Sequence, residues 1–160
     1  MQLFHGFRFT FLGALLAQCV VILLYYFEII HKRRILLRDK YEQLMFLFQD
    51  SLKFYKDISK CKNIEELLLY EISEASQRSI GLALLYFPEF IQNIEKYMQV
   101  QLKFYNLVIT SFNPQIPVSA GAQIRRHNAE KTTQIEKELF QIKDTILKDF
   151  KKYAKKYTMS

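Results

Sequence analysis

The chain has 160 residues, half of them hydrophobic, and carries a formal net charge of +7. Besides one long apolar segment near its start, about 130 residues remain, which is enough for one compact domain but not for two. Cysteine occurs at Cys19, inside the apolar segment, and at Cys61, so the composition argues against a disulfide-linked fold and fits a reducing compartment.

The apolar segment has no charged residue from Phe9 to Phe27. As an α-helix, residues 9–30 would be about 33 Å long, which matches the roughly 30 Å hydrocarbon core of a bilayer. The sequence therefore predicts a single transmembrane helix over residues 9–30, preceded by a short extracytoplasmic stub over residues 1–8.

The basic residues beside this segment predict its orientation. Arg8 precedes it, whereas a basic cluster follows it with Lys32, Arg33, Arg34 and Arg38. Because cytoplasmic flanks carry the excess of lysine and arginine, we expect the C-terminal side in the cytoplasm. Abundant Ile, Lys, Phe and Tyr without Trp suggest a bacterial coding sequence, so the expected location is the bacterial inner membrane, with the lipid bilayer as a partner.

Three other interpretations of the apolar segment stay open: a cleavable signal peptide, a lipoprotein leader and the core helix of a soluble protein. Gln18 precedes Cys19 where the lipoprotein motif has a small residue, and apolar residues continue to Phe27 without a small-residue cleavage site. Core helices are seldom this long without a charge. A transmembrane helix accounts best for the segment.

Helical periodicity continues after the basic cluster. Apolar residues recur every three or four positions from Leu37 to Tyr55, which predicts that the first helix extends to about Ser59. Asn63 and Glu66 form an approximate capping box for a second helix. This helix should stop before Pro88, where a third begins, with an apolar stripe at Ile91, Ile94, Met98, Leu102, Tyr105 and Val108.

Two prolines and a glycine predict a loop over residues 113–122. A long last helix follows, with an apolar seam at Ile135, Leu139, Ile142, Ile146, Phe150, Tyr153 and Tyr157. We expect this seam to pack against the other helices, with an intermolecular coiled coil as the alternative. The predicted fold is all-α: a single N-terminal transmembrane helix that continues into a cytoplasmic antiparallel four-helix domain over residues 31–160.

Residues 104–124 also lack charge and could form a second or re-entrant span. Their asparagines, glutamines and two prolines would leave polar groups unsatisfied in lipid, at a cost of several kcal/mol per group. A loop between packed helices is the preferred interpretation.

Two basic groups are candidate anion- or lipid-binding sites: Arg125 and Arg126 beside the loop, and Lys148, Lys151, Lys152, Lys155 and Lys156 near the C-terminus. Aromatic residues alternate with these lysines in sequence, which is typical of a basic amphipathic helix. Such a helix could bind anionic lipid or nucleic-acid phosphate, or simply be a solvated helix end.

No catalytic motif, phosphate-binding loop or cysteine cluster occurs, and His5, His31 and His127 are too scattered to share a metal. We expect no cofactor, no metal and no catalytic residue. The function expected is that of a membrane-tethered helical interaction or assembly subunit, non-enzymatic, with a protein partner or a homo-oligomer. A membrane-acting or toxin-like effector is the alternative, and a membrane-bound nucleic-acid-binding protein or nuclease is the second alternative.

Overall fold

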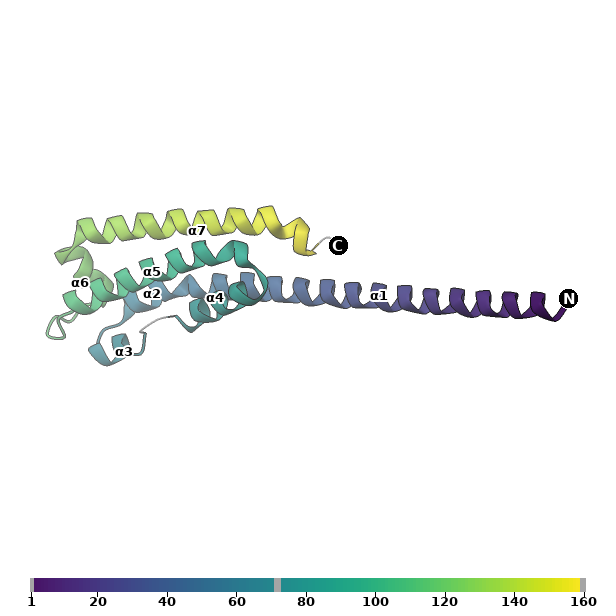
Figure 1. Ribbon diagram of the computed structural model, residues 1–160. Helices are drawn as coiled ribbons and strands as arrows, with labels where there is room; N and C mark the ends of the chain where they lie inside the picture. The colour runs from purple at the N-terminus through teal and green to yellow at the C-terminus, as the bar shows by residue number, and fades with distance from the viewer. Residues whose placement is uncertain (1, 71–72, 159–160) are drawn as a thin grey trace. The chain divides into compact units, whose positions relative to one another are not determined.

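The computed structural model describes residues 2–70 and 73–158, and the side chains from Gly13 onward. Every regular element in these ranges is an α-helix, which confirms the predicted all-α class (Figure 1). The chain divides into two units, Met1–Asp39 and Lys40–Ser160, which we call unit 1 and unit 2.

Unit 1 is formed by the first part of α1 (Gln2–Ser51). The side chains of residues 13–29 are all exposed, although most of them are apolar. By length and composition, this is the one helix in the described part of the chain that could cross a membrane. The predicted long apolar N-terminal helix is confirmed.

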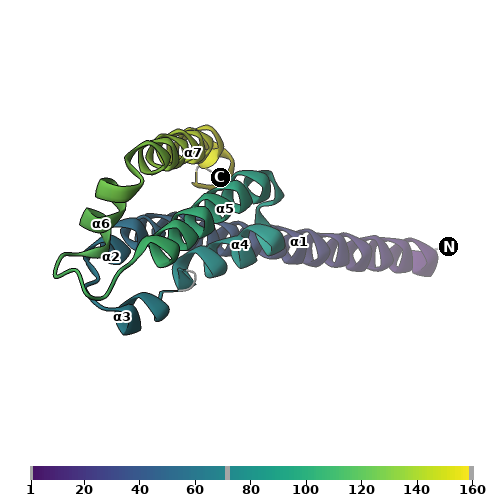
Figure 2. The ribbon, with the colours of Figure 1, turned by 90° about the vertical axis from the view of Figure 1, so that its left-hand side faces the viewer.

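Unit 2 contains the last turns of α1 and shorter helices. These are α2 (Lys53–Lys60), α3 (Ile64–Leu68), α4 (Glu74–Tyr86), α5 (Pro88–Ser111), α6 (Ala120–His127) and α7 (Ala129–Thr158). Helix α5 is central, because it packs against α2, α4, α6 and α7 (Figures 1 and 2).

The first helix is interrupted at Leu52 and does not run unbroken to Ser59, as the periodicity predicted. Polar side chains from α5 hold the end of α1 at this point. Tyr97 Oη and Gln101 Nε2 donate hydrogen bonds to the Ser51 carbonyl, at 3.3 and 3.1 Å. Gln101 Oε1 also accepts from Ser76 Oγ of α4 at 2.7 Å. Hydrophobic periodicity cannot reveal such a break, because its stabilising partners lie on other helices.

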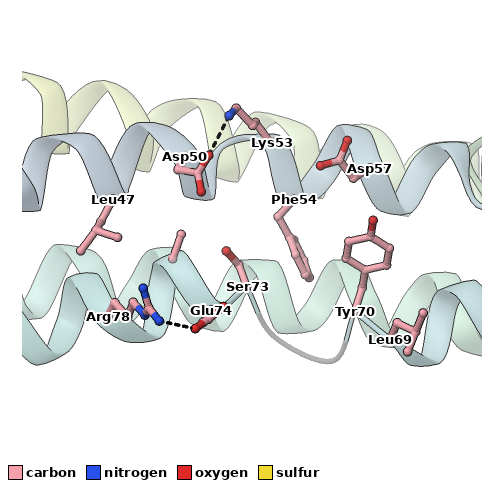
Figure 3. A pocket seen from close by; sticks show the side chains of 11 residues that line it. Leu47, Asp50, Lys53, Phe54, Asp57, Leu69, Tyr70, Ser73, Glu74 and Arg78 are labelled. Atoms are coloured by element: carbon pink, nitrogen blue, oxygen red, sulfur yellow. Dashed lines mark hydrogen bonds and ion pairs between the residues drawn. The ribbon is translucent and has the colours of Figure 1, made fainter.

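The predicted capping box at Asn63 is confirmed. Asn63 Oδ1 accepts the Glu66 backbone N–H at 2.7 Å, and a Glu66 carboxylate oxygen accepts the Lys62 N–H at 2.9 Å. The helix that begins there is short, since α3 ends at Leu68 and α4 begins at Glu74. A hollow of about 390 Å³ is present here (Figure 3). The end of α1 and α2 form one wall, and the residues around the end of α3 and the start of α4 form the other.

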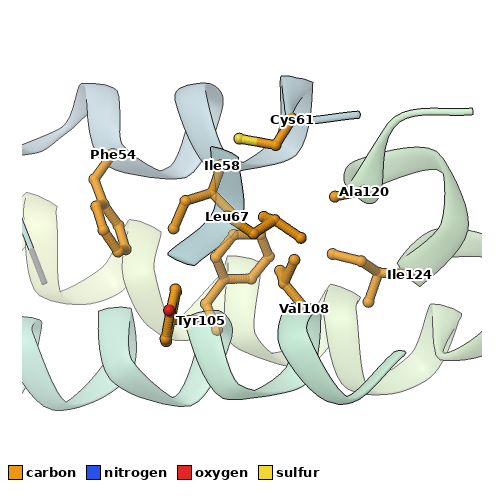
Figure 4. Close-up of a cluster of buried hydrophobic side chains, with 9 residues drawn as sticks. Phe54, Ile58, Cys61, Leu67, Tyr105, Val108, Ala120 and Ile124 are labelled. Atoms are coloured by element: carbon orange, nitrogen blue, oxygen red, sulfur yellow. The ribbon is translucent and has the colours of Figure 1, made fainter. Parts of the chain in front are cut away.

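Helix α6 closes one end of unit 2, which we call the distal end. A buried apolar cluster lies there (Figure 4), made of Phe54, Ile58, Cys61, Leu67, Phe104, Tyr105, Val108, Ala120 and Ile124. The Ala120 N–H donates to the Cys61 carbonyl at 2.8 Å. Next to it, a Cβ on Gly121 would lie 2.8 Å from Ser59 Cβ, so the close approach of α6 to α2 requires glycine.

The segment between α5 and α6 is anchored by one buried side chain. Gln123 accepts the Asn113 N–H at 2.7 Å and donates to the Asn113 and Val118 carbonyls at 3.1 and 3.0 Å. The irregular segment ends at Ser119, where the loop was expected over residues 113–122, and Ala120 already belongs to α6. The polar groups of Gln123 and the backbone of Asn113, which would be unsatisfied in lipid, therefore find partners within unit 2.

Candidate functional site

The end of unit 2 opposite the distal end, where the chain enters unit 2, is organised around the buried side chain of Tyr41. Tyr41 is the second residue of unit 2 and is fully buried. Its ring stacks on Tyr157 with 5.2 Å between centroids and meets Phe87 and Phe150 edge to face at 5.7 and 5.8 Å. We call this region the proximal end. The end of α7 and the turn between α4 and α5 both lie there.

The aromatic contacts fix the last turns of α7 on this end. Phe90 stacks on Phe150 with centroids 4.9 Å apart and meets Tyr153 edge to face at 5.5 Å, while Phe87 meets Tyr157 at 4.8 Å. Each such pair contributes about 0.5–1.5 kcal/mol beyond the area that it buries. Aromatic contacts with Tyr41, Phe87 and Phe90 thus hold the C-terminal part of α7 in place.

A hydrogen bond also joins Tyr41 to α7. The Tyr41 hydroxyl donates to the Phe150 carbonyl. Burial, with the neighbouring Tyr157 and Glu89, raises the pKa of Tyr41 to about 12. The hydroxyl is therefore protonated, as a donor must be, at any physiological pH.

Glu89, in the first turn of α5, adds polar contacts to these aromatic ones. Its carboxylate accepts a hydrogen bond from Tyr157 Oη and lies 3.1 Å from Lys156 Nζ. Burial raises the pKa of Glu89, but the hydrogen bond from Tyr157 and the ammonium of Lys156 outweigh burial and hold the pKa below its ordinary value. Lys156 is thereby tied to the protein.

The other lysines of the C-terminal group share the outer face of α7. Their helical spacing places Lys148, Lys151, Lys152 and Lys155 on the side opposite Phe150, and all four are exposed. Lys152 Nζ lies 4.9 Å from the Tyr153 ring centre. In the described part of the chain, no acidic side chain pairs with Lys148, Lys151 or Lys155. We call Lys148, Lys151, Lys152 and Lys155 the lysine face.

The aromatic residues that alternate with the lysines in sequence do not share this face. Phe150 and Tyr157 are buried and Tyr153 is half-buried against Phe90. They therefore fasten α7 to unit 2 and are not available for insertion into lipid. The lysine face itself contains no aromatic residue.

Two exposed leucines lie at the same end of unit 2. Leu84 and Leu85, in the last turn of α4, are 60% and 76% exposed and come shortly before the buried Phe87. Sequence analysis did not identify them, although the signal was present: both lie off the apolar stripe of their helix. They form a small exposed apolar edge at the end of α4.

The candidate residues of the sequence do not form one site. Arg125 and Arg126 lie on α6, and Arg125 Nη2 is 3.4 Å from a Glu136 carboxylate oxygen that also accepts from Tyr55. Glu136, the partner of Arg125, precedes Lys148 by 12 residues of α7, which is about 18 Å along the helix. The flanking cluster Lys32, Arg33, Arg34 and Arg38 belongs to unit 1, where Lys32 pairs with Glu28 at 2.7 Å.

The hollow in Figure 3 has a mixed lining. Phe54 and Tyr70 point into the gap, and its charges are largely paired, with Asp50 2.7 Å from Lys53 and Glu74 2.6 Å from Arg78. Among the described residues, no group of three or more histidine, cysteine or acidic side chains could hold a metal ion. A search of protein families, characterised proteins and solved structures finds no match to this chain.

Proposed function

We propose that this chain is a membrane-tethered helical subunit that binds other proteins or further copies of itself and does not act as an enzyme. In this proposal, residues 9–30 cross the bacterial inner membrane once and unit 2 lies in the cytoplasm. The end of α1, α4, α5 and α7 would form the antiparallel four-helix domain, in keeping with the packing of α5 against α4 and α7.

The exposure of apolar side chains in α1 is the main support for the proposed membrane tether. The side chains of Val20, Val21, Ile22, Leu23 and Leu24 are all more than half exposed, and no described residue covers them. Water is a poor solvent for such a surface, whereas each of these residues gains roughly 0.3–0.6 kcal/mol at the centre of a bilayer. The basic cluster after the helix supports the orientation.

Exposed apolar residues of unit 2 support the interaction role. Phe140, on α7, is 62% exposed and borders a hollow of about 210 Å³, which Tyr55, Tyr97 and Leu139 also line. Phe46 and Leu69 are exposed as well. Apolar side chains beside a surface hollow are typical of protein-binding sites, so a partner subunit or a second copy is the expected occupant.

Membrane fractionation of the full chain tests the tether. The chain should stay in the membrane pellet through an alkaline wash, and a C-terminal fluorescent fusion should be active in the cytoplasm, whereas a C-terminal alkaline phosphatase fusion should be inactive. The variant Val21→Lys with Leu24→Lys should lose membrane retention, because each charge costs about 2.5–3.5 kcal/mol at the centre of a span. The matched control Phe46→Lys with Leu69→Lys should keep it.

Release of the unaltered chain by the alkaline wash would contradict the tether. Purification from mild detergent then tests the interaction role, with co-purified protein or a defined homo-oligomer as the expected result. A monomer without partners that depolarises the membrane on expression would instead identify the effector alternative, and co-purified nucleic acid would identify the nucleic-acid-binding alternative.

A further inference from the structure

We infer that unit 2 pairs with a second copy of itself through one side of α7. This surface consists of Glu136, Phe140, Lys143 and the hollow that all three line, and we call it the Phe140 face. The inference rests on the proposed interaction role and names the partner that this surface fits. It uses residues of unit 2 alone.

The hollow of the Phe140 face has room for an aromatic ring from a partner. Its volume is about 210 Å³, whereas an apolar cavity of about 150 Å³ is already large enough to bind benzene. Its other lining residues are Leu52, Tyr55 on α2, Tyr97 on α5 and Leu139 on α7. The hollow therefore presents carbon-rich walls from three helices.

The walls of the hollow are held in place within unit 2. Tyr55 Oη donates a hydrogen bond to the Glu136 carboxylate, and the Tyr55 ring lies on Phe104 with 4.3 Å between centroids. Tyr97 Oη donates to the Ser51 carbonyl at 3.3 Å. A hollow whose walls are already ordered binds a partner at a lower entropic cost.

Phe140 is itself a suitable occupant for such a hollow. Its side chain is 62% exposed, and it also borders a second hollow, of about 280 Å³, with Thr133 and Gln141. One surface thus carries both a projecting ring and a depression that can receive a ring. A two-fold axis between two copies would place each Phe140 against the hollow of the other, which gives the same contact twice.

Charges on the Phe140 face favour an antiparallel arrangement of the two α7 helices. Glu136 precedes Phe140 by four residues and Lys143 follows it by three, so all three share one stripe of the helix. In antiparallel helices centred between residues 139 and 140, Glu136 lies opposite the partner's Lys143, and Phe140 lies opposite the partner's Leu139. Parallel helices would instead oppose Glu136 with Glu136 and Lys143 with Lys143, which is unfavourable.

This complementarity selects a second copy as the occupant. Lys143 has no acidic partner in the described part of the chain, whereas Glu136 is fixed by Tyr55 and lies 3.4 Å from Arg125. An unrelated protein would have to supply an aromatic side chain flanked by charges in the reverse order. The same surface turned by 180° supplies both. A face that carries both signs of charge is also poorly suited to anionic lipid or nucleic acid.

The mass of the full chain in mild detergent tests the pairing. Light scattering over a range of protein concentrations should give a dimer. Phe140→Gln should raise the dissociation constant about a hundredfold or more, because a symmetric interface loses two buried rings and each contributes roughly tenfold or more. The melting temperature should not fall, since Phe140 is exposed in the single copy. Phe46→Gln, at a 69% exposed phenylalanine on α1, is the matched control and should keep the dimer.

Charge variants test the arrangement. Lys143→Glu should weaken the dimer, because each copy then opposes Glu136 with a second carboxylate, and the loss should shrink in 1 M salt, where screening acts over about 3 Å. Lys155→Glu, outside the Phe140 face, should have no effect. Glu136→Lys should weaken the dimer as well. A mixture of the Lys143→Glu and Glu136→Lys chains should restore a dimer, because all opposed charges then differ in sign. Circular dichroism verifies that each variant is folded.

The possible failures are distinguishable. A dimer that both Phe140→Gln and Lys143→Glu leave intact would overturn the inference, since the contact would then lie elsewhere. A mixture of folded charge variants that stays monomeric would overturn the antiparallel arrangement. A monomeric unaltered chain that co-purifies with a different protein would overturn the pairing and leave the proposed interaction role standing. A monomer without any protein partner would overturn both.

Discussion

At the scale of single residues, Glu89 shows how the C-terminal helix is held. Its carboxylate accepts a hydrogen bond from Tyr157 Oη, and Lys156 Nζ lies 3.1 Å away, so one acidic group joins α5 to the end of α7. Because the folded-state pKa of Glu89 lies below its unfolded value, the carboxylate stabilises the fold above that unfolded value, near pH 4.5. The contribution is lost as the pH falls through the folded pKa.

Glu89→Gln should therefore lower the free energy of unfolding at pH 7 by about 1.5–3 kcal/mol, the range for a hydrogen bond to a charged group. The difference from the unaltered chain should shrink as the pH falls below 4.5, and both chains carry a neutral side chain only below the folded pKa of Glu89. Thermal unfolding in detergent, followed by circular dichroism at several pH values, measures both effects. Glu95→Gln, at an exposed position on the same helix, is the control. An equal deficit at pH 4 and pH 7 would mean that the charge of Glu89 contributes nothing.

The candidate site was partly predictable at this scale. The spacing of Lys148, Lys151, Lys152 and Lys155 was enough to predict a cationic helix face. The role of Glu89 was not predictable, because it depends on which helices meet at the proximal end. Sequence order alone also mixed Phe150 with the lysines, although helical geometry places it on the opposite side.

At the scale of elements, α7 shows what helical periodicity predicts and what it omits. Ile146, Phe150 and Tyr157 of the predicted seam are buried, whereas Ile135, Leu139 and Ile142 are half-buried. The spacing identifies the inward stripe correctly. It cannot rank depth along the stripe, because depth depends on what lies opposite, and Leu139 faces the hollow shared with Tyr55 and Tyr97.

Aspartate substitutions along the seam should reveal this gradient. Ile146→Asp puts an unpaired charge at a fully buried position and should abolish cooperative unfolding of unit 2. Leu139→Asp should cost less, because water in the hollow can solvate the carboxylate. Circular dichroism melts of the full chain in detergent compare the two variants. Equal loss in both would show that the hollow closes in solution and that the whole seam is core.

At the scale of the whole molecule, the two units differ in how their apolar side chains are covered. The aromatic cluster around Tyr41 and the distal cluster around Ile58 use residues of unit 2 alone. The side chains of residues 13–29 in unit 1 are exposed, without such cover from the described residues. Unit 2 thus has a core of its own, while the apolar side chains of unit 1 stay exposed.

A fragment that begins at Lys40 should therefore be soluble, strongly helical and cooperative in unfolding, because it keeps every residue of both clusters. Conversely, residues 1–39 fused to a soluble reporter should carry the reporter to the membrane. Ultracentrifugation of cell extracts tests both halves. The fragment should leave the membrane fraction completely in 1 M salt, since only exposed lysines would hold it there. Aggregation of the fragment would show that unit 1 covers part of unit 2, and a reporter that stays soluble would contradict an autonomous tether.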